Sequence, residues 1–97
     1  MKTTPFSVEV TAHCERLVKR LTRQHGELPE RLTEALEILR ADPYDRARRY
    51  PIKKLKGVPA GDGQYRLRLG RWRFRYDIEG QDVTLHYVGL RREDTYR

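Results

Sequence analysis

Four arginines that alternate with apolar residues are the side chains in this sequence whose types and spacing most clearly suit chemistry. They lie in the segments YRLRL (65–69) and WRFRY (72–76), and they are Arg66, Arg68, Arg73 and Arg75. Because side chains of a β-strand alternate between two faces, we expect all four guanidinium groups on one face of a hairpin. A two-residue turn at Gly70-Arg71 would place Arg68 opposite Arg73 and Arg66 opposite Arg75.

Anion binding is the chemistry that suits two such like-charged pairs. Like charges directly opposite each other destabilise a sheet by about 0.2–1 kcal/mol per pair. A charge-assisted hydrogen bond to an anion contributes about 1.5–3 kcal/mol, and guanidinium groups bind phosphate through two parallel hydrogen bonds. The pattern therefore favours a bound phosphodiester over the alternative, a basic face that is only solvated.

A histidine in the following segment adds a titratable group. Val83, Leu85 and Tyr87 alternate with Thr84, His86 and Val88, which predicts a third strand with the first set on its apolar face. A turn at Glu79-Gly80 or Gly80-Gln81 would place His86 on the arginine side, opposite Arg73 or Arg75 respectively. His86 could then exchange a proton with a substrate, or only bind phosphate or water.

The cysteine and histidine content indicates neither a disulfide nor a metal site. Cys14 is the single cysteine, and it lies on an apolar helical stripe, where it is expected to be buried filler. The three histidines, His13, His25 and His86, have no spacing typical of metal ligands. We expect no metal and no cofactor.

The charge of the chain predicts a polyanionic partner. The 97 residues carry a net charge of +7, and residues 51–97 hold 11 Lys/Arg against 6 Asp/Glu, a larger excess than in residues 1–50. A basic excess of this kind suits nucleic acid, although a solvated basic surface is the alternative. The sequence has no run of about 18 apolar residues, and its first residues lack the apolar stretch of a signal peptide, so we expect a cytoplasmic protein.

The elements that would position these side chains form a single α+β domain over residues 1–97. Residues 6–10 alternate like a short strand, and Thr11 can cap a helix whose apolar stripe is Cys14, Leu17, Val18 and Leu21. Gly26 is expected to stop this helix, and Pro29 to lie in the first turn of a second helix, which ends at Asp42-Pro43. The stripe of the second helix is Leu32, Ala35, Leu36 and Leu39.

The C-terminal half is predicted to be a sheet that covers this antiparallel helical hairpin. Residues 44–63 contain several prolines and glycines and indicate a loop with a short strand around 52–55. From Tyr65 onward three alternating segments predict a curved antiparallel meander with one apolar face. The expected fold is a short N-terminal strand, then the helical hairpin, packed on the meander.

The order of these elements and several motifs resemble the RelE/ParE toxins over nearly the whole chain. The most specific motifs are YRLRLG (65–70) with WRFRY (72–76), followed by VGLRREDTY (88–96), and KLKG (54–57) also fits. The resemblance implies a toxin of a type II toxin–antitoxin system that a cognate antitoxin protein blocks. Members of the RelE branch cleave mRNA in the ribosomal A site by attack of the ribose 2′-OH, which leaves a 2′,3′-cyclic phosphate and a 5′-OH. This chemistry needs no metal ion.

The resemblance also assigns roles to residues of this chain. The implied catalytic residues are Arg66, Arg68, Arg73, Arg91 and Tyr96, and the residues predicted to bind RNA are Lys53, Lys54, Lys56, Arg75, His86 and Arg92. The RelE type has lysines where this chain has Arg66 and Arg68, and arginine cannot act as a general base. Tyr96 is therefore the preferred proton-transfer group, with His86 as the alternative. A second implied function is that of a ParE-like inhibitor of DNA gyrase, which shares the fold and has no chemistry of its own.

Overall fold

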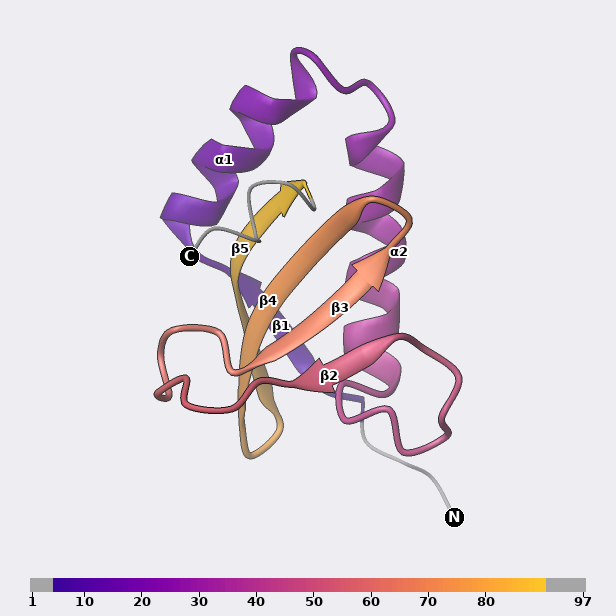
Figure 1. Ribbon diagram of the computed structural model, residues 1–97, viewed down its shortest axis with the longest axis vertical. Helices are drawn as coiled ribbons and strands as arrows, with labels where there is room; N and C mark the ends of the chain where they lie inside the picture. Colours follow the sequence, from indigo (N-terminus) through magenta and orange to yellow (C-terminus); the bar gives the residue numbers. More distant parts are fainter. Residues whose placement is uncertain (1–4, 91–97) are drawn as a thin grey trace.

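A five-stranded sheet with two helices on one of its faces makes up the protein, as seen in a computed structural model that describes residues 5–90 (Figure 1). In chain order the elements are β1 (Ser7–Val10), α1 (Ala12–Thr22), α2 (Leu28–Ala41), β2 (Ile52–Lys54), β3 (Tyr65–Leu69), β4 (Trp72–Glu79) and β5 (Asp82–Leu90). The strand order is β1-β5-β4-β3-β2. β1 runs parallel to β5, and the other neighbours are antiparallel.

Local sequence explains where both helices begin and where α2 ends, whereas α1 ends at Thr22, before the stop predicted at Gly26. The side chain of Thr11 accepts a hydrogen bond from the backbone N–H of Cys14 at 3.1 Å, so the predicted cap of α1 is confirmed. Pro29 lies in the first turn of α2, where a missing N–H costs nothing, and α2 ends at Ala41 just before Asp42-Pro43. Within residues 5–90, neither helix has the length and apolar character needed to cross a membrane.

The core lies between the helices and the apolar face of the sheet. Its largest fully buried side chains include Trp72, Phe74 and Tyr76 of β4, and they pack with residues of both helices. The predicted stripe of α2 is partly wrong. Leu28 and Ile38 are buried with Ala35 and Leu39, whereas Leu32 and Leu36 are only half-buried.

The predicted meander is confirmed, and two further strands extend it. Gly70-Arg71 connects β3 to β4, and Gly80-Gln81 connects β4 to β5, with the glycine supplying the positive φ in each turn. β2 adds to the outer edge of β3. β1 joins the other edge, beside β5, although it is about 75 residues away along the chain.

A β-bulge in β5 corrects the predicted position of His86. Arg75 lies opposite Tyr87, while the next residue, Tyr76, lies opposite Leu85, so His86 is an extra residue on β5. His86 is therefore opposite neither Arg73 nor Arg75, and that expectation was wrong. The bulge also shifts the alternation by one residue. Val88 faces the core and is fully buried, and Tyr87 faces the arginine side rather than the apolar side.

Candidate nucleic-acid interface

The four arginines of the hairpin lie on the sheet face that the helices leave uncovered, which we call the arginine face. The pairings Arg68 with Arg73 and Arg66 with Arg75 are as the sequence predicts. Neighbouring strands extend each pair into a row across the sheet. One row is Lys53, Arg66, Arg75 and Tyr87, and the other is Arg68, Arg73 and Gly89.

The arginines differ in burial, and therefore in the free energy that desolvation of their charges costs. Arg73, at the centre of its row, is only 5% exposed, while Arg68 is exposed and Arg66 is half-buried. The Nε atom of Arg66 is buried and has no hydrogen-bond partner in the described part of the chain. An unsatisfied buried donor costs about 1–3 kcal/mol, more for a charged group, and an anionic oxygen would remove that cost.

Arg75 also holds a loop in place. Its Nε and Nη2 donate to the carbonyl oxygen of Gly63 at 3.2 and 3.1 Å, and Nη2 also donates to that of Asp62 at 3.1 Å. The loop between β2 and β3 is thus fixed against the arginine face. Contact of Arg75 with RNA remains a prediction. The Arg75 side chain already has these intramolecular partners.

Asp77, two residues further along β4, binds the same stretch of this loop. Its carboxylate accepts hydrogen bonds from the backbone N–H groups of Gly61, Gly63 and Gln64 at 2.9–3.0 Å. Burial opposes ionisation of Asp77, but these N–H groups and the nearby His86 outweigh it and hold the pKa of the carboxyl below its usual value. Asp77 is therefore a fixed anion beside the arginines.

His86 pairs with this anion. Its Nε2 atom lies 2.8 Å from Oδ2 of Asp77, and the two side chains are 26% and 14% exposed. Both line a pocket of about 400 Å³ whose wall also contains Gly61, Gln64 and Thr84. The predicted RNA contact of His86 is untested, and its ring is directed to a carboxylate rather than to the rows of cations.

The three lysines predicted to bind RNA do not share one surface. Lys53 stands opposite Arg66 and extends its row on the arginine face. Lys54, the next residue of β2, has its ammonium group 5.6 Å from the ring centroid of Tyr65, whose side chain packs against the core. Lys56 is exposed in the loop that follows β2. By position, Lys53 is the lysine that belongs with the arginines.

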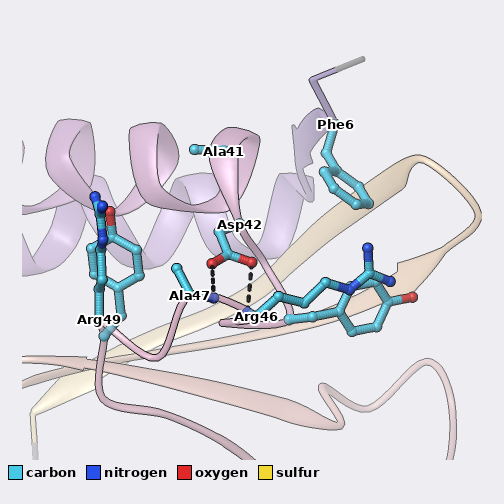
Figure 2. Close-up of a pocket in the computed structure, with 8 residues that line it drawn as sticks. Phe6, Ala41, Asp42, Arg46, Ala47 and Arg49 are labelled. Carbon is cyan, nitrogen blue, oxygen red and sulfur yellow. Dashed lines mark hydrogen bonds between the residues drawn. The ribbon is translucent and has the colours of Figure 1, made fainter. Parts of the chain in front are cut away.

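A segment with three arginines and two aspartates, residues 42–51, follows α2 and lines a pocket of about 480 Å³ together with Phe6 and Ala41 (Figure 2). The carboxylate of Asp42 accepts the backbone N–H groups of Arg46 and Ala47 at 2.9 and 3.0 Å, and the Arg46 guanidinium lies 4.7 Å from the ring centroid of Tyr44. Tyr44 makes edge contacts with Phe6 and with the core-packed Tyr65. This pocket is therefore separate from the arginine face.

Tyr87 is a polar residue of the arginine face that the sequence did not predict there. A continuous alternation through β5 assigned it to the core. The signal for the bulge was present, because Val83 and Leu85 alternate and Val88 and Leu90 alternate, with two residues between the pairs instead of one.

Three predicted site residues, Arg91, Arg92 and Tyr96, lie outside the described residues. Among residues 5–90, no group of three or more His, Cys, Asp or Glu side chains is arranged to hold a metal ion. Cys14 is buried, as predicted, and burial raises the pKa of its thiol to about 12, so it remains protonated.

Comparison with known proteins identifies the fold. No family model matches the chain, and no curated protein matches it either. Among solved structures, a chain of the crystal structure of the archaeal RelE–RelB complex from Pyrococcus horikoshii OT3 is similar, with a TM-score of 0.65. The match covers 92% of this chain and 97% of that chain, at 24% sequence identity. The chain has a RelE-like fold. The expected α+β architecture is thereby confirmed.

Proposed function

We propose that this protein is the toxin of a type II toxin–antitoxin system and cleaves mRNA on the ribosome. The observation that carries the proposal is the two cross-strand rows of cations on the uncovered face of a RelE-like sheet. Four arginines and Lys53 match the charge of a polynucleotide backbone, and guanidinium groups match phosphate geometry. The resemblance of the sequence motifs to RelE toxins supplies the reaction class.

In the proposed reaction the 2′-oxygen of a ribose attacks the adjacent phosphorus. The new 2′-O–P bond forms as the P–O5′ bond breaks, which gives a 2′,3′-cyclic phosphate and a 5′-OH. Negative charge develops on the phosphoryl oxygens, and fixed guanidinium groups stabilise it electrostatically. Arg73, central and largely buried, is assigned this role with Arg91, while Arg66 and Arg68 bind the flanking phosphates.

Proton transfer falls to a group other than the arginines, because arginine does not lose its proton in proteins. Tyr96 is the proposed proton-transfer group near the 2′-OH. Dependence on the 2′-OH restricts the substrate to RNA, since DNA lacks the attacking group. The reaction is proposed to need no metal ion and no cofactor.

The proposed protein partner is a cognate antitoxin. The similar structure was determined as a RelE–RelB complex, and the sequence resemblance implies an antitoxin for this chain as well. The rows of cations on the arginine face would bind cellular RNA, so the antitoxin is proposed to bring carboxylates towards Arg66, Arg73 or Arg91. A neighbouring gene for a short protein with an acidic helical segment would support this partner.

The test compares the parent with Arg73→Ala in a translation assay with primer extension. The parent should cut mRNA and leave 2′,3′-cyclic phosphate ends, and an mRNA with 2′-H at the cleavage position should resist. Arg73→Ala should lose about 10²–10³ in rate, the usual effect of removing one electrostatic donor. Thermal melting checks that the variant is folded.

Arg31→Ala is the matched control, because Arg31 is an exposed arginine of α2 that pairs with Glu34. Its cleavage rate should equal that of the parent. A parent that leaves mRNA intact but inhibits DNA gyrase would overturn the nuclease proposal in favour of the ParE-like function.

A further inference from the structure

Transesterification of RNA requires two proton transfers, and the proposed function assigns only one of them. The 2′-OH must lose a proton as it attacks, and the departing 5′-oxygen must gain one. The arginines can do neither efficiently, because a guanidinium group holds its proton at any physiological pH. His86, the titratable residue predicted from the sequence, is paired with Asp77 at 2.8 Å. A second proton-transfer group is therefore needed on the arginine face.

The bulge in β5 brings Tyr87 to this face. Tyr87 is the cross-strand partner of Arg75 and stands at the end of the row that begins with Lys53 and Arg66. Without the extra residue at His86, the alternation of β5 would point Tyr87 into the core. The bulge thus re-aims one side chain, which is how bulges beside active sites commonly act.

The neighbouring glycine shows where the phenol ring lies. A Cβ atom added to Gly89 would lie 2.6 Å from Cζ of Tyr87 and closer still to its hydroxyl oxygen. The ring therefore extends along β5 over Gly89, in space that any other residue at position 89 would fill. Gly89 is the cross-strand partner of Arg73. The Tyr87 hydroxyl consequently reaches the row of Arg73 and Arg68, although its Cα belongs to the row of Arg75.

We propose that Tyr87 is the general acid that protonates the 5′-oxygen leaving group. The inference rests on the proposed nuclease function and adds a catalytic residue to it. The phenol of tyrosine carries an O–H group that can donate a proton. As the P–O5′ bond breaks, the phenolic proton moves to the 5′-oxygen, and the tyrosinate regains a proton from water. Arg73, whose cross-strand partner Gly89 lies under the ring of Tyr87, stabilises the phosphoryl charge in the same step.

The test pairs Tyr87→Phe with two RNA substrates in the translation-coupled assay. On ordinary RNA the variant should lose about 10²–10⁴ in cleavage rate, as expected for loss of a positioned acid. The second substrate carries sulfur in place of the 5′-bridging oxygen at the cleavage position. A thiolate leaves without protonation because thiols are far more acidic than alcohols. On that substrate the variant should be within about threefold of the parent.

Gly89→Ala provides an independent variant that keeps the phenol but displaces its ring. It should also lose cleavage of ordinary RNA and recover with the sulfur substrate. Tyr44→Phe is the matched control, because Tyr44 is 37% exposed and lies at the separate pocket beside α2. That variant should cleave both substrates at the parental rate. Melting curves and binding to an uncleavable 2′-H RNA establish that each variant folds and still binds.

The outcomes separate this inference from the proposed function. A parent that cleaves neither substrate would overturn the nuclease function and the role of Tyr87 together. An active parent with Tyr87→Phe at the parental rate would overturn only the role of Tyr87. An equal loss on both substrates would overturn the general-acid assignment, because a defect in fold or binding does not depend on the leaving atom.

Discussion

At the scale of single residues, Glu27 connects the helical hairpin to the sheet. Its Oε2 accepts hydrogen bonds from Nη2 of Arg71 at 2.8 Å and from Nε1 of Trp72 at 3.1 Å. The ring of His25 makes an edge contact with that of Trp72, 5.3 Å between centroids. The hydrogen bond from Arg71 is the main cause that lowers the pKa of Glu27 to about 2. The β3–β4 turn is therefore tied to the segment that joins α1 and α2.

This pKa shift predicts how stability depends on pH. The ordinary value is 4.5 and the folded value is about 2, so the ionised Glu27 favours the folded state above pH 4.5. That contribution is lost as the pH falls towards 2. Glu27→Gln keeps the acceptor oxygen but removes the charge, so it should melt below the parent at pH 7, with a gap that shrinks from pH 5 to pH 2. Thermal melting across this range measures it.

Glu37→Gln is the control, because Glu37 is an exposed glutamate within α2. Its melting temperature should differ little from that of the parent at each pH. A gap for Glu27→Gln that is constant from pH 7 to pH 2 would contradict the prediction, because it would show that the charge of Glu27 contributes nothing.

At the scale of elements, the loop between β2 and β3 owes its shape to side chains of β4. It has no regular secondary structure, yet Asp77 accepts three of its backbone N–H groups and Arg75 donates to two of its carbonyl oxygens. The opposite charges of these two side chains match the donors and acceptors of the loop. β4 therefore binds the loop through these two side chains, and the bound loop borders the arginine face.

Asp77→Asn should release this loop. The amide has one acceptor oxygen instead of two and no charge, so at least one N–H group loses its partner. Hydrogen bonds to charged groups contribute about 1.5–3 kcal/mol, which sets the expected loss of stability. The backbone amides of Gly61, Gly63 and Gln64 should exchange hydrogen faster than in the parent. Amide exchange followed by NMR measures this directly.

Asp62→Asn is the control, since Asp62 lies in the same loop and contributes its backbone carbonyl rather than its side chain to the contact with Arg75. Its exchange rates should match those of the parent. Unchanged protection of Gly63 and Gln64 in Asp77→Asn would show that the carboxylate does not hold the loop.

The elements were predictable where local patterns determine them. Thr11, Pro29 and the Gly70-Arg71 turn act on their immediate neighbours, and each was correctly placed. The turn at Gly80 was left open between Glu79-Gly80 and Gly80-Gln81, and the structure has the second. The buried stripe of α2 was only partly predicted, because the helix has apolar residues on a wide arc. The rotation of α2 about its own axis against the sheet then decides that Ile38 is buried and Leu36 is only half-buried. The parallel pairing of β1 with β5 is a long-range contact that no periodicity specifies.

The site shows the same division between local and long-range information. Alternation placed the four arginines on one face and gave their cross-strand partners correctly. It failed at β5, because a bulge depends on how two strands exchange hydrogen bonds, and the shift exchanged the roles of Tyr87 and Val88. The hydrogen bonds from Arg75 to loop carbonyls, unlike the bulge, had no signal in the sequence, since they require the loop conformation that Asp77 imposes.

At the scale of the whole molecule, the two faces of the sheet differ in chemical character. α1 contacts β5, and α2 contacts β1 and β3, so the helices bury the apolar face (Figure 1). The opposite face carries Lys53, Arg66, Arg68 and Arg73, with Arg75 held by the loop. Under the proposed function, the net charge of +7 attracts a polyanion from a distance and the arginine face is the surface that binds it.

The placement of these cations on one face of the sheet predicts how RNA binding depends on salt. Four phosphate contacts on a single strand give a slope of log K against log [salt] of about −3, because each contact releases roughly 0.7 counterion. Arg68→Gln should reduce the slope by about 0.7, whereas Arg75→Gln should change it less, because the guanidinium of Arg75 already donates to Asp62 and Gly63. Arg20 is an exposed arginine of α1, so Arg20→Gln should leave the slope unchanged. Fluorescence anisotropy with an uncleavable 2′-H strand measures each slope. Equal slopes for Arg68→Gln and Arg20→Gln would mean that the polyanion responds to total charge and that the arginine face is not its binding site.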